Sequence, residues 1–250
     1  MGSVRLLLLV VAVLSLQVLS VSADVITVDG DDSDWLNPDS SHDDPLGDVV
    51  VPGTPPTPLP GYDLDWTYYS WDADNGRAAF MGQTAAPTTH TYSADFVEIL
   101  INADDDLDTG GEWHEMLGAD YRVWWDYDGV ANEVYDPISS GHPVYWDQWV
   151  GGSTGWQTVA GLQASDVLIA WGNMGSDYSV IEVTLNPSLF GNPDAFTWGM
   201  YLDNGTTASD DASPDRMDQR GYTPEPTTFV LLPLGLAALA GWRRRTRQVT

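Results

Sequence analysis

The 250-residue sequence contains no cysteine and no lysine, and its nine basic residues are all arginines. Without cysteine, neither a disulfide framework nor a zinc–thiolate site can form. Positive charge is scarce between residues 24 and 223, where four arginines accompany 36 of the 37 acidic residues. Because such a surface repels phosphate backbones, we expect no nucleic-acid partner. The same surface attracts divalent cations.

Long stretches of helical periodicity are also missing, and no internal repeat is evident. The chain instead shows short β-rich runs divided by Gly, Asp, Asn and Pro. High net charge can indicate disorder, but 12 Trp, 11 Tyr and 5 Phe supply ample core material. We therefore predict an all-β fold, an antiparallel β-sandwich. The candidate strands are residues 25–28, 64–71, 77–81, 96–102, 121–127, 144–150, 156–162, 167–171, 178–183 and 196–202, with one short helix at 186–191.

An apolar run lies near each end of the chain. Arg5 precedes an apolar run at residues 6–14, and the small residues Val21 and Ala23 follow it, which predicts a signal peptide at 1–23 that signal peptidase removes. The alternative is an N-terminal membrane anchor, but the run is short and a polar domain follows. We expect export.

At the other end, residues 226–242 carry no charge, and as a helix they would span about 26 Å, close to the hydrocarbon thickness of about 30 Å. Arg243, Arg244 and Arg245 follow this run and would keep that end cytoplasmic, with the acidic domain outside. The segment before it, residues 205–223, is polar and predicts a linker after a domain at 24–204.

The order Pro224, Glu225, Pro226, apolar helix and arginine cluster resembles the PEP-CTERM sorting signal of exported proteins in Gram-negative bacteria. The resemblance covers residues 224–250 and implies a membrane-embedded exosortase that cuts near the Pro-Glu-Pro motif. It implies a protein held transiently in the inner membrane by this transmembrane helix and then placed at the cell surface or outside the cell. A plain stop-transfer anchor predicts the same topology.

A second resemblance spans most of the region between the two ends. The segments ITVDGDDSDW, DPLGD, ILINADDDLDTGG, LGADYRV and YSVIEVTLNPSLFG follow one another in an order similar to carbohydrate-binding module family 9 and DOMON-like sandwiches. This implies a jelly-roll or immunoglobulin-like sandwich that binds a ligand, often a glycan, and is not catalytic. The proline-rich residues 36–62, which we expect to form a long loop, depart from the pattern, and no sugar-contacting residue can be carried over.

Asp104, Asp106 and Asp108 alternate, and Glu115 is the twelfth residue of the run, which matches the spacing of oxygen ligands in a calcium loop. A cation would relieve the repulsion among these carboxylates, and calcium suits hard oxygen ligands better than zinc does. Thr109 stands at position six in place of glycine, and the flanks resemble strands, so the loop is not an EF-hand. The alternative is a solvated acidic loop.

The tryptophans at presumed loops and strand ends are candidates for stacking on a sugar: Trp113, Trp124, Trp125, Trp146 and Trp149. For each of them the alternative is a place in the core, where most tryptophans of a sandwich lie. Trp124 and Trp125 are adjacent in a candidate strand, so their side chains should point to opposite faces.

No catalytic motif is convincing. Residues 151–155 fit the pattern G-x-S-x-G, but a strand-like run follows them where that motif requires a helix, so we expect a glycine-rich hairpin. We predict an exported surface protein, not an enzyme, that binds extracellular polysaccharide and uses calcium as a structural ion. The alternatives are a secreted glycan hydrolase with an Asp/Glu pair and a structural matrix component.

Overall fold

The computed structural model describes residues 25–43, 50–51, 57–58, 63–72, 74–87, 95–113, 116–127, 133–135, 144–152, 154–203 and 217–222. The predicted signal peptide, the sorting signal and Glu115 lie outside these residues. Within them, no helix has the length and apolar character needed to cross a membrane.

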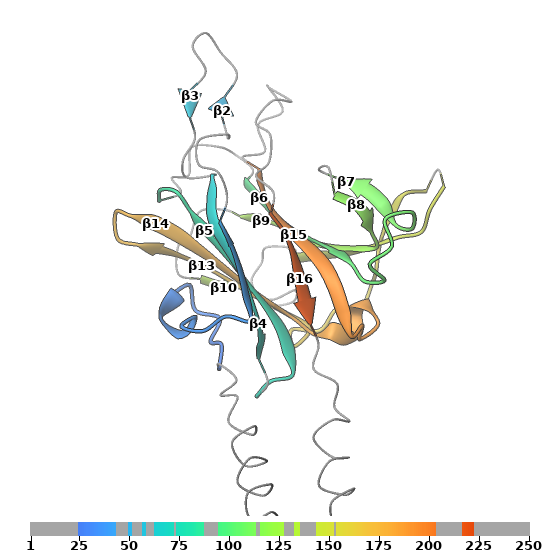
Figure 1. The fold of residues 1–250 in the computed structure, drawn as a ribbon, viewed down its shortest axis with the longest axis horizontal. Coiled ribbons are helices and arrows are strands. Elements are labelled where there is room, and N and C mark those ends of the chain that lie inside the picture. The colour runs from blue at the N-terminus through green and yellow to red at the C-terminus, as the bar shows by residue number, and fades with distance from the viewer. Residues whose placement is uncertain are drawn as a thin grey trace, which may run out of the picture.

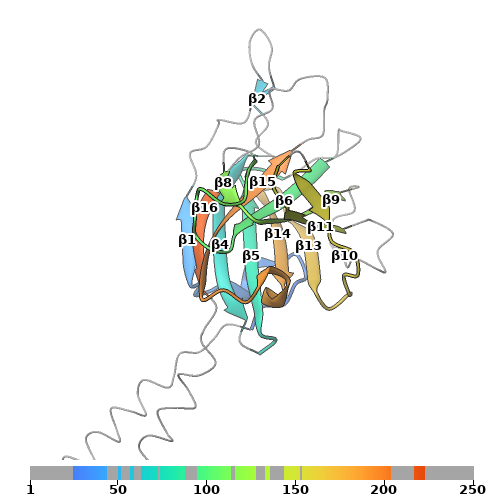
Figure 2. The same ribbon diagram turned by 90° about the vertical axis from the view of Figure 1, so that its right-hand side faces the viewer.

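The described residues form an all-β fold in which two six-stranded antiparallel sheets face each other (Figures 1 and 2). Sheet I consists, in spatial order, of β1 (Ser40–Asp43), β4 (Leu64–Asp72), β5 (Arg77–Thr84), β14 (Tyr178–Leu185), β13 (Val167–Met174) and β10 (Glu133–Tyr135). Sheet II consists of β12 (Trp156–Thr158), β11 (Val144–Trp149), β9 (Tyr121–Tyr127), β6 (Asp95–Asn102), β15 (Ala195–Asp203) and β16 (Met217–Tyr222). Two small hairpins are added by β2 (Val50–Val51) with β3 (Thr57–Pro58) and by β7 (Gly111–Trp113) with β8 (Met116–Ala119).

The core lies between the two sheets, because alternate residues of each strand point inward. On β6 the inward residues are Val97, Ile99 and Ile101, each without exposed surface. Aromatic rings fill the space between the layers, and Phe80 of sheet I meets Trp198 of sheet II edge to face, with 4.8 Å between ring centroids. Apolar surface buried in this way stabilises the fold by about 25 cal/mol per Å².

Most of the strands expected from alternation are confirmed, and residues 121–127 match their expected bounds in full. The expected helix at 186–191 is a single 3₁₀ turn, Pro187–Phe190, which begins after Asn186 because the Asn186 side chain accepts a bond from the backbone of Ser188. Residues 151–155 connect β11 to its antiparallel neighbour β12, so the expected glycine-rich hairpin is confirmed.

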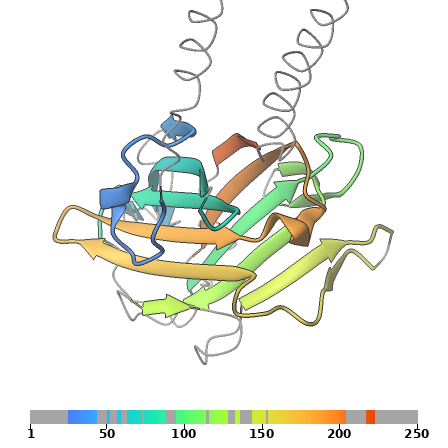
Figure 3. The same cartoon turned by 90° about the horizontal axis from the view of Figure 1, so that it is seen from below.

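The N-terminal described segment corrects one strand prediction. Residues 25–28 join no sheet and instead lie against the outer face of sheet I, as the blue segment in Figure 3 shows. Ile26 and Trp35 of this segment are buried against Met81 and Val180, so they form a second, smaller apolar cluster outside the main core.

The edges of both sheets correct two further expectations. Residues 217–222 were expected in a polar linker but form β16, which pairs with β15 and extends the sandwich beyond residue 204. Residues 36–62 were expected to be a loop but include β1, which pairs with β4. The two strands are the edges of their sheets on the same side of the sandwich, where they lie near each other.

Candidate functional site: an aromatic face on sheet II

The outer face of sheet II carries a concentration of aromatic and charged side chains. Along β9, Val123 and Trp125 point into the core, so the alternating residues Arg122 and Trp124 point outward. The register of β9 with β11 places Tyr145 opposite Trp124 on this outer face. The sheet geometry therefore gathers side chains that are far apart in the sequence.

Arg122 lies at the centre of this face. Its guanidinium carbon is 4.7 Å from the ring centroid of Trp113 and 5.0 Å from that of Trp156. Both distances are within cation–π range, and the guanidinium also lies 5.8 Å from the ring of Trp124. The arginine thus links the β7–β8 hairpin, which projects beside the sandwich in Figure 1, to β9 and β12.

Asp147 fixes the position of Arg122. Its Oδ2 accepts from Arg122 Nε at 2.7 Å and from Trp124 Nε1 at 3.0 Å, and its Oδ1 accepts from the Thr158 hydroxyl at 2.7 Å. Asp147 is only 2% exposed, and three donors compensate for the burial of its charge. This network of β9, β11 and β12 holds the surrounding rings in fixed positions.

The rings on the face also contact one another. Trp124 stacks on Tyr145 with 4.1 Å between centroids and 15° between planes, and Trp149 meets Trp156 edge to face at 5.5 Å. Trp149 also covers Gly111, where a Cβ would approach ring atoms to 2.7 Å, so only glycine fits beneath this ring. The set that we call the aromatic face, each member partly exposed, consists of Trp113, Trp124, Tyr145, Trp149 and Trp156.

Glu98 anchors the hairpin side of this face. Its Oε2 accepts from Trp113 Nε1 at 2.7 Å, and Glu98 lies opposite Trp124 in the pairing of β6 with β9. The β7–β8 hairpin also buries Met116 and Ala119 against Leu100. The ring of Trp113 is therefore held by a hydrogen bond on one side and by Arg122 on the other.

Three of the five predicted stacking residues, Trp113, Trp124 and Trp149, lie on this face. The other two require a correction, because Trp125 and Trp146 are 0% and 1% exposed and lie in the core between the sheets. They face the opposite sheet and offer no ring surface to a ligand. For both residues, the alternative given above, a place in the core, is confirmed.

Sequence reasoning missed Tyr145, Trp156 and Arg122 as members of the site. The signal for the first was present, since Tyr145, Asp147 and Trp149 alternate along one strand and must share a face. The position of Trp156 depends on its pairing with Trp149 across the hairpin, which requires the register.

The predicted calcium loop follows β6 and has a regular geometry. The Asp104 side chain accepts from the backbone of Asp106 at 3.0 Å, and the Asp106 side chain accepts from the backbone of Asp108 at 3.0 Å. These are successive Asx turns, and the Thr109 hydroxyl also donates to Asp104. No group of three or more His, Cys, Asp or Glu residues within the described ranges is arranged to hold a metal ion, and Glu115 lies outside those ranges.

Asp120 lies at the base of this loop, where its Oδ2 accepts from the backbone of Ala103 at 2.9 Å. Burial raises the pKa of Asp120, and the negative charge of Asp104 acts in the same direction. The loop therefore concentrates negative charge next to a half-buried carboxyl group.

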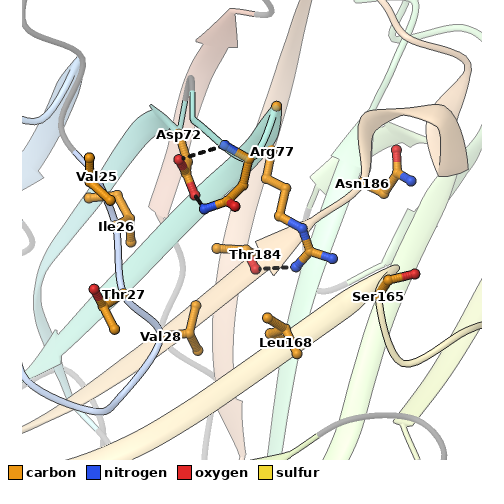
Figure 4. A pocket seen from close by; sticks show the side chains of 12 residues that line it. Val25, Ile26, Thr27, Val28, Asp72, Arg77, Ser165, Leu168, Thr184 and Asn186 are labelled. Carbon is orange, nitrogen blue, oxygen red and sulfur yellow. Dashed lines mark hydrogen bonds between the residues drawn. The ribbon is translucent and has the colours of Figure 1, made fainter.

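Sheet I has a separate cleft on its own outer face, beside the N-terminal segment (Figure 4). It has a volume of about 750 Å³. Arg77 at the start of β5 extends into it and donates from Nη1 to the Thr184 hydroxyl at 2.7 Å.

The wall of this cleft is held in place by Glu182 of β14. Glu182 has no exposed surface, and it accepts from Trp35 Nε1 at 2.7 Å and from the backbone of Gly30 and Asp29 at 2.6 and 2.9 Å. Burial raises the pKa of Glu182 to about 7, although the three N–H donors act to lower it. The segment before Trp35 is thereby fastened to the centre of sheet I.

Searches of protein-family profiles, of curated proteins and of solved structures find no match for this chain.

Proposed function

We propose that this protein is an exported, exosortase-processed protein of the cell surface or extracellular space whose β-sandwich binds polysaccharide through the aromatic face of sheet II. The observation that carries the proposal is the gathering of five partly exposed aromatic side chains around the Arg122–Asp147 pair on one face. Flat apolar rings with polar groups at their edges suit the alternating C–H and hydroxyl surfaces of sugars.

The fixed geometry of this face supports a binding role. A ligand that lies on rings already held in place needs to immobilise few side chains, so less entropy is lost on association. Asp147, Glu98 and Arg122 hold the rings by hydrogen bonds and cation–π contacts within the protein itself.

Export and processing are part of the same proposal and rest on residues 1–23 and 224–250. A strongly acidic domain between an export signal and a sorting signal is consistent with work outside the cytoplasm. We propose calcium as a structural ion of the Asp104–Asp108 loop, since this loop places several carboxylates near the β7–β8 hairpin that carries Trp113.

Affinity electrophoresis in gels containing extracellular polysaccharide tests the binding function. Replacing Trp149 by Ala should reduce the retardation by about two- to tenfold, the equivalent of about 0.5–1.5 kcal/mol for one aromatic contact. Gln157→Ala is the matched control, because Gln157 is exposed on the neighbouring strand and does not belong to the aromatic face.

Three results would contradict the proposal. Equal retardation of Trp149→Ala and the wild type would remove the aromatic face from the binding site. Release of reducing ends from the polysaccharide would make the protein a hydrolase. Calcium-dependent self-association without any retardation by polysaccharide would make it a structural matrix component.

A further inference from the structure

The cleft on sheet I lies on the side of the sandwich opposite to the aromatic face. Its walls come from the N-terminal segment, from the β4–β5 turn and from the ends of β13 and β14. With a volume of about 750 Å³ it falls within the usual range for small-molecule sites. Its lining residues come from the N-terminal segment, from strands of sheet I and from the turns beside them, so the fold itself creates the cleft.

Arg77 is the one basic residue among the residues that line this cleft and is partly buried, and Asp72 is the one acidic residue among them. A guanidinium has five N–H donors, and among the described residues the one hydrogen bond of this side chain goes to Thr184. It makes no ion pair with any described residue. Burial lowers the pKa of Arg77, and the negative charges of Asp72 and Asp166 act in the opposite direction.

The two acidic residues whose negative charges act on Arg77 accept hydrogen bonds from other groups. Asp72 is 1% exposed, and its two oxygens accept from the backbone and side chain of Asn75 at 3.2 and 2.7 Å. Asp166 accepts from the backbone of Gln163 at 2.8 Å and from Asn186 Nδ2 at 3.5 Å. They moderate the positive charge of Arg77 from a distance, and no described acidic residue accepts a hydrogen bond from its guanidinium.

The groups around the guanidinium define the ligand that would fit. Hydroxyl and amide groups of Thr27, Ser165 and Asn186 line the cleft, and Leu168 and Val28 supply an apolar surface below them (Figure 4). The fork of an arginine matches a carboxylate with two parallel hydrogen bonds. The hydroxyl and amide groups match the hydroxyls of a sugar or polyol, and the apolar floor matches its C–H surface.

The charge of the whole chain selects among anions. With a formal net charge of −28, the protein repels a phosphate monoester more strongly than a carboxylate, which carries one unit of charge. We propose that the cleft around Arg77 is a binding site for a sugar acid of one or two rings, held by its carboxylate on the Arg77 guanidinium. This site does not depend on the aromatic face of sheet II.

Isothermal titration of the purified full-length chain with digalacturonic acid tests the proposal, and the dimethyl ester of the same disaccharide serves as the uncharged control. We expect the acid to bind and the ester to bind at least about tenfold more weakly, because a bidentate charge-assisted pair is lost. Arg77→Gln should weaken binding of the acid by about tenfold or more, and Trp149→Ala should leave it unchanged.

A measurement on the wild-type chain keeps the test independent of how the variants fold. In ¹⁵N-resolved NMR spectra, the Nε–H signal of Arg77 should shift on titration with the acid, while that of Arg122, paired with Asp147, should not. Equal binding of acid and ester, undiminished binding by Arg77→Gln, or no shift of the Arg77 signal at millimolar ligand would each overturn the proposal. Loss of binding in Trp149→Ala would do so too, since it would place the sugar acid on sheet II.

Discussion

Glu182 is a carboxyl group with no exposed surface, fastened under the N-terminal segment by Trp35 and Gly30. Because its pKa is raised to about 7 in the folded state, the folded protein binds a proton that the unfolded chain releases above its ordinary pKa of 4.5. This group therefore makes the free energy of unfolding fall as pH rises from about 4.5 to about 7, and adds no further change above that.

The expected result is a loss of about 3 kcal/mol in the free energy of unfolding between pH 5 and pH 8 that is specific to Glu182. Urea denaturation of the wild type and of Glu182→Gln at both pH values measures it, because the neutral amide has no proton to release. Other acidic residues contribute equally to both proteins and cancel in the difference. Parallel pH profiles for the two proteins would show that Glu182 does not titrate in this range.

Gly172 shows how closely the N-terminal segment approaches sheet I. A Cβ at Gly172 would lie 1.9 Å from the carbonyl oxygen of Gly30, and this backbone cannot move aside while Glu182 holds it. Gly172→Ala should therefore lower the free energy of unfolding by about 2 kcal/mol. Thermal denaturation followed by near-ultraviolet circular dichroism measures this loss.

The control for Gly172→Ala is Gly82→Ala, which is also in a central strand of sheet I. A Cβ at Gly82 would meet the sulfur of Met200, the far part of a flexible side chain that can rotate away. Gly82→Ala should cost clearly less than Gly172→Ala. If the two substitutions cost the same, the close approach of Gly30 to sheet I is not the reason for glycine at position 172.

At the scale of the element, alternation identified the long central strands because their two faces meet different surroundings. In β6 the inward Val97 and Ile99 are apolar, and the outward Glu98 is not, so period two is visible in the sequence. The edge strand β16 (MDQRGY) has no such contrast, and its place next to β15 follows from the register of the whole sheet.

Alternation alone was also insufficient to assign the tryptophans of the candidate site. Alternation showed that Trp124 and Trp125 point to opposite faces, but it could not say which face the second sheet covers. For the segment at residues 25–28, the apolar alternation was real, since Ile26 is buried and Thr27 exposed. Its partner was the outer face of sheet I and not a neighbouring strand, and a pattern of side chains alone does not distinguish these two.

Calcium binding by the loop after β6 would change the stability of the protein. If the Asp104–Asp108 loop binds calcium in the folded state only, calcium at about 100 times its Kd should raise the free energy of unfolding by about 2.7 kcal/mol. Differential scanning calorimetry measures this as a higher Tm. The double substitution Asp104→Asn, Asp106→Asn should abolish the shift, while its successive turns can still form because Asn also accepts backbone hydrogen bonds.

Sodium chloride at matched ionic strength is the control for this measurement. The chain has 37 acidic and nine basic residues, so any cation screens its self-repulsion to some extent. An equal rise in Tm with sodium chloride and with calcium would show general adaptation to salt, and no ion at the loop.

In the whole molecule, the domain and the C-terminal tail carry charges of opposite sign. The sandwich is strongly acidic, whereas four of the nine arginines lie within residues 243–247. A cluster of this kind holds its end of an apolar helix on the cytoplasmic side until processing. In the native Gram-negative host, mass spectrometry of the surface or extracellular fraction should find a protein that starts near Asp24 and ends near the Pro224–Glu225–Pro226 motif.

Replacing Arg243, Arg244 and Arg245 together by Gln should reduce the processed form, because the helix is then no longer retained in the orientation that the exosortase requires. Arg247→Gln alone is the matched control, since it removes one charge from the same tail but leaves the cluster intact. Both variants keep the sandwich unchanged, so their export can be compared by the amount of folded domain. An intact tail on wild-type protein that remains in the inner membrane would make residues 226–242 a permanent anchor, and the aromatic face would then act at the membrane and not at the cell surface.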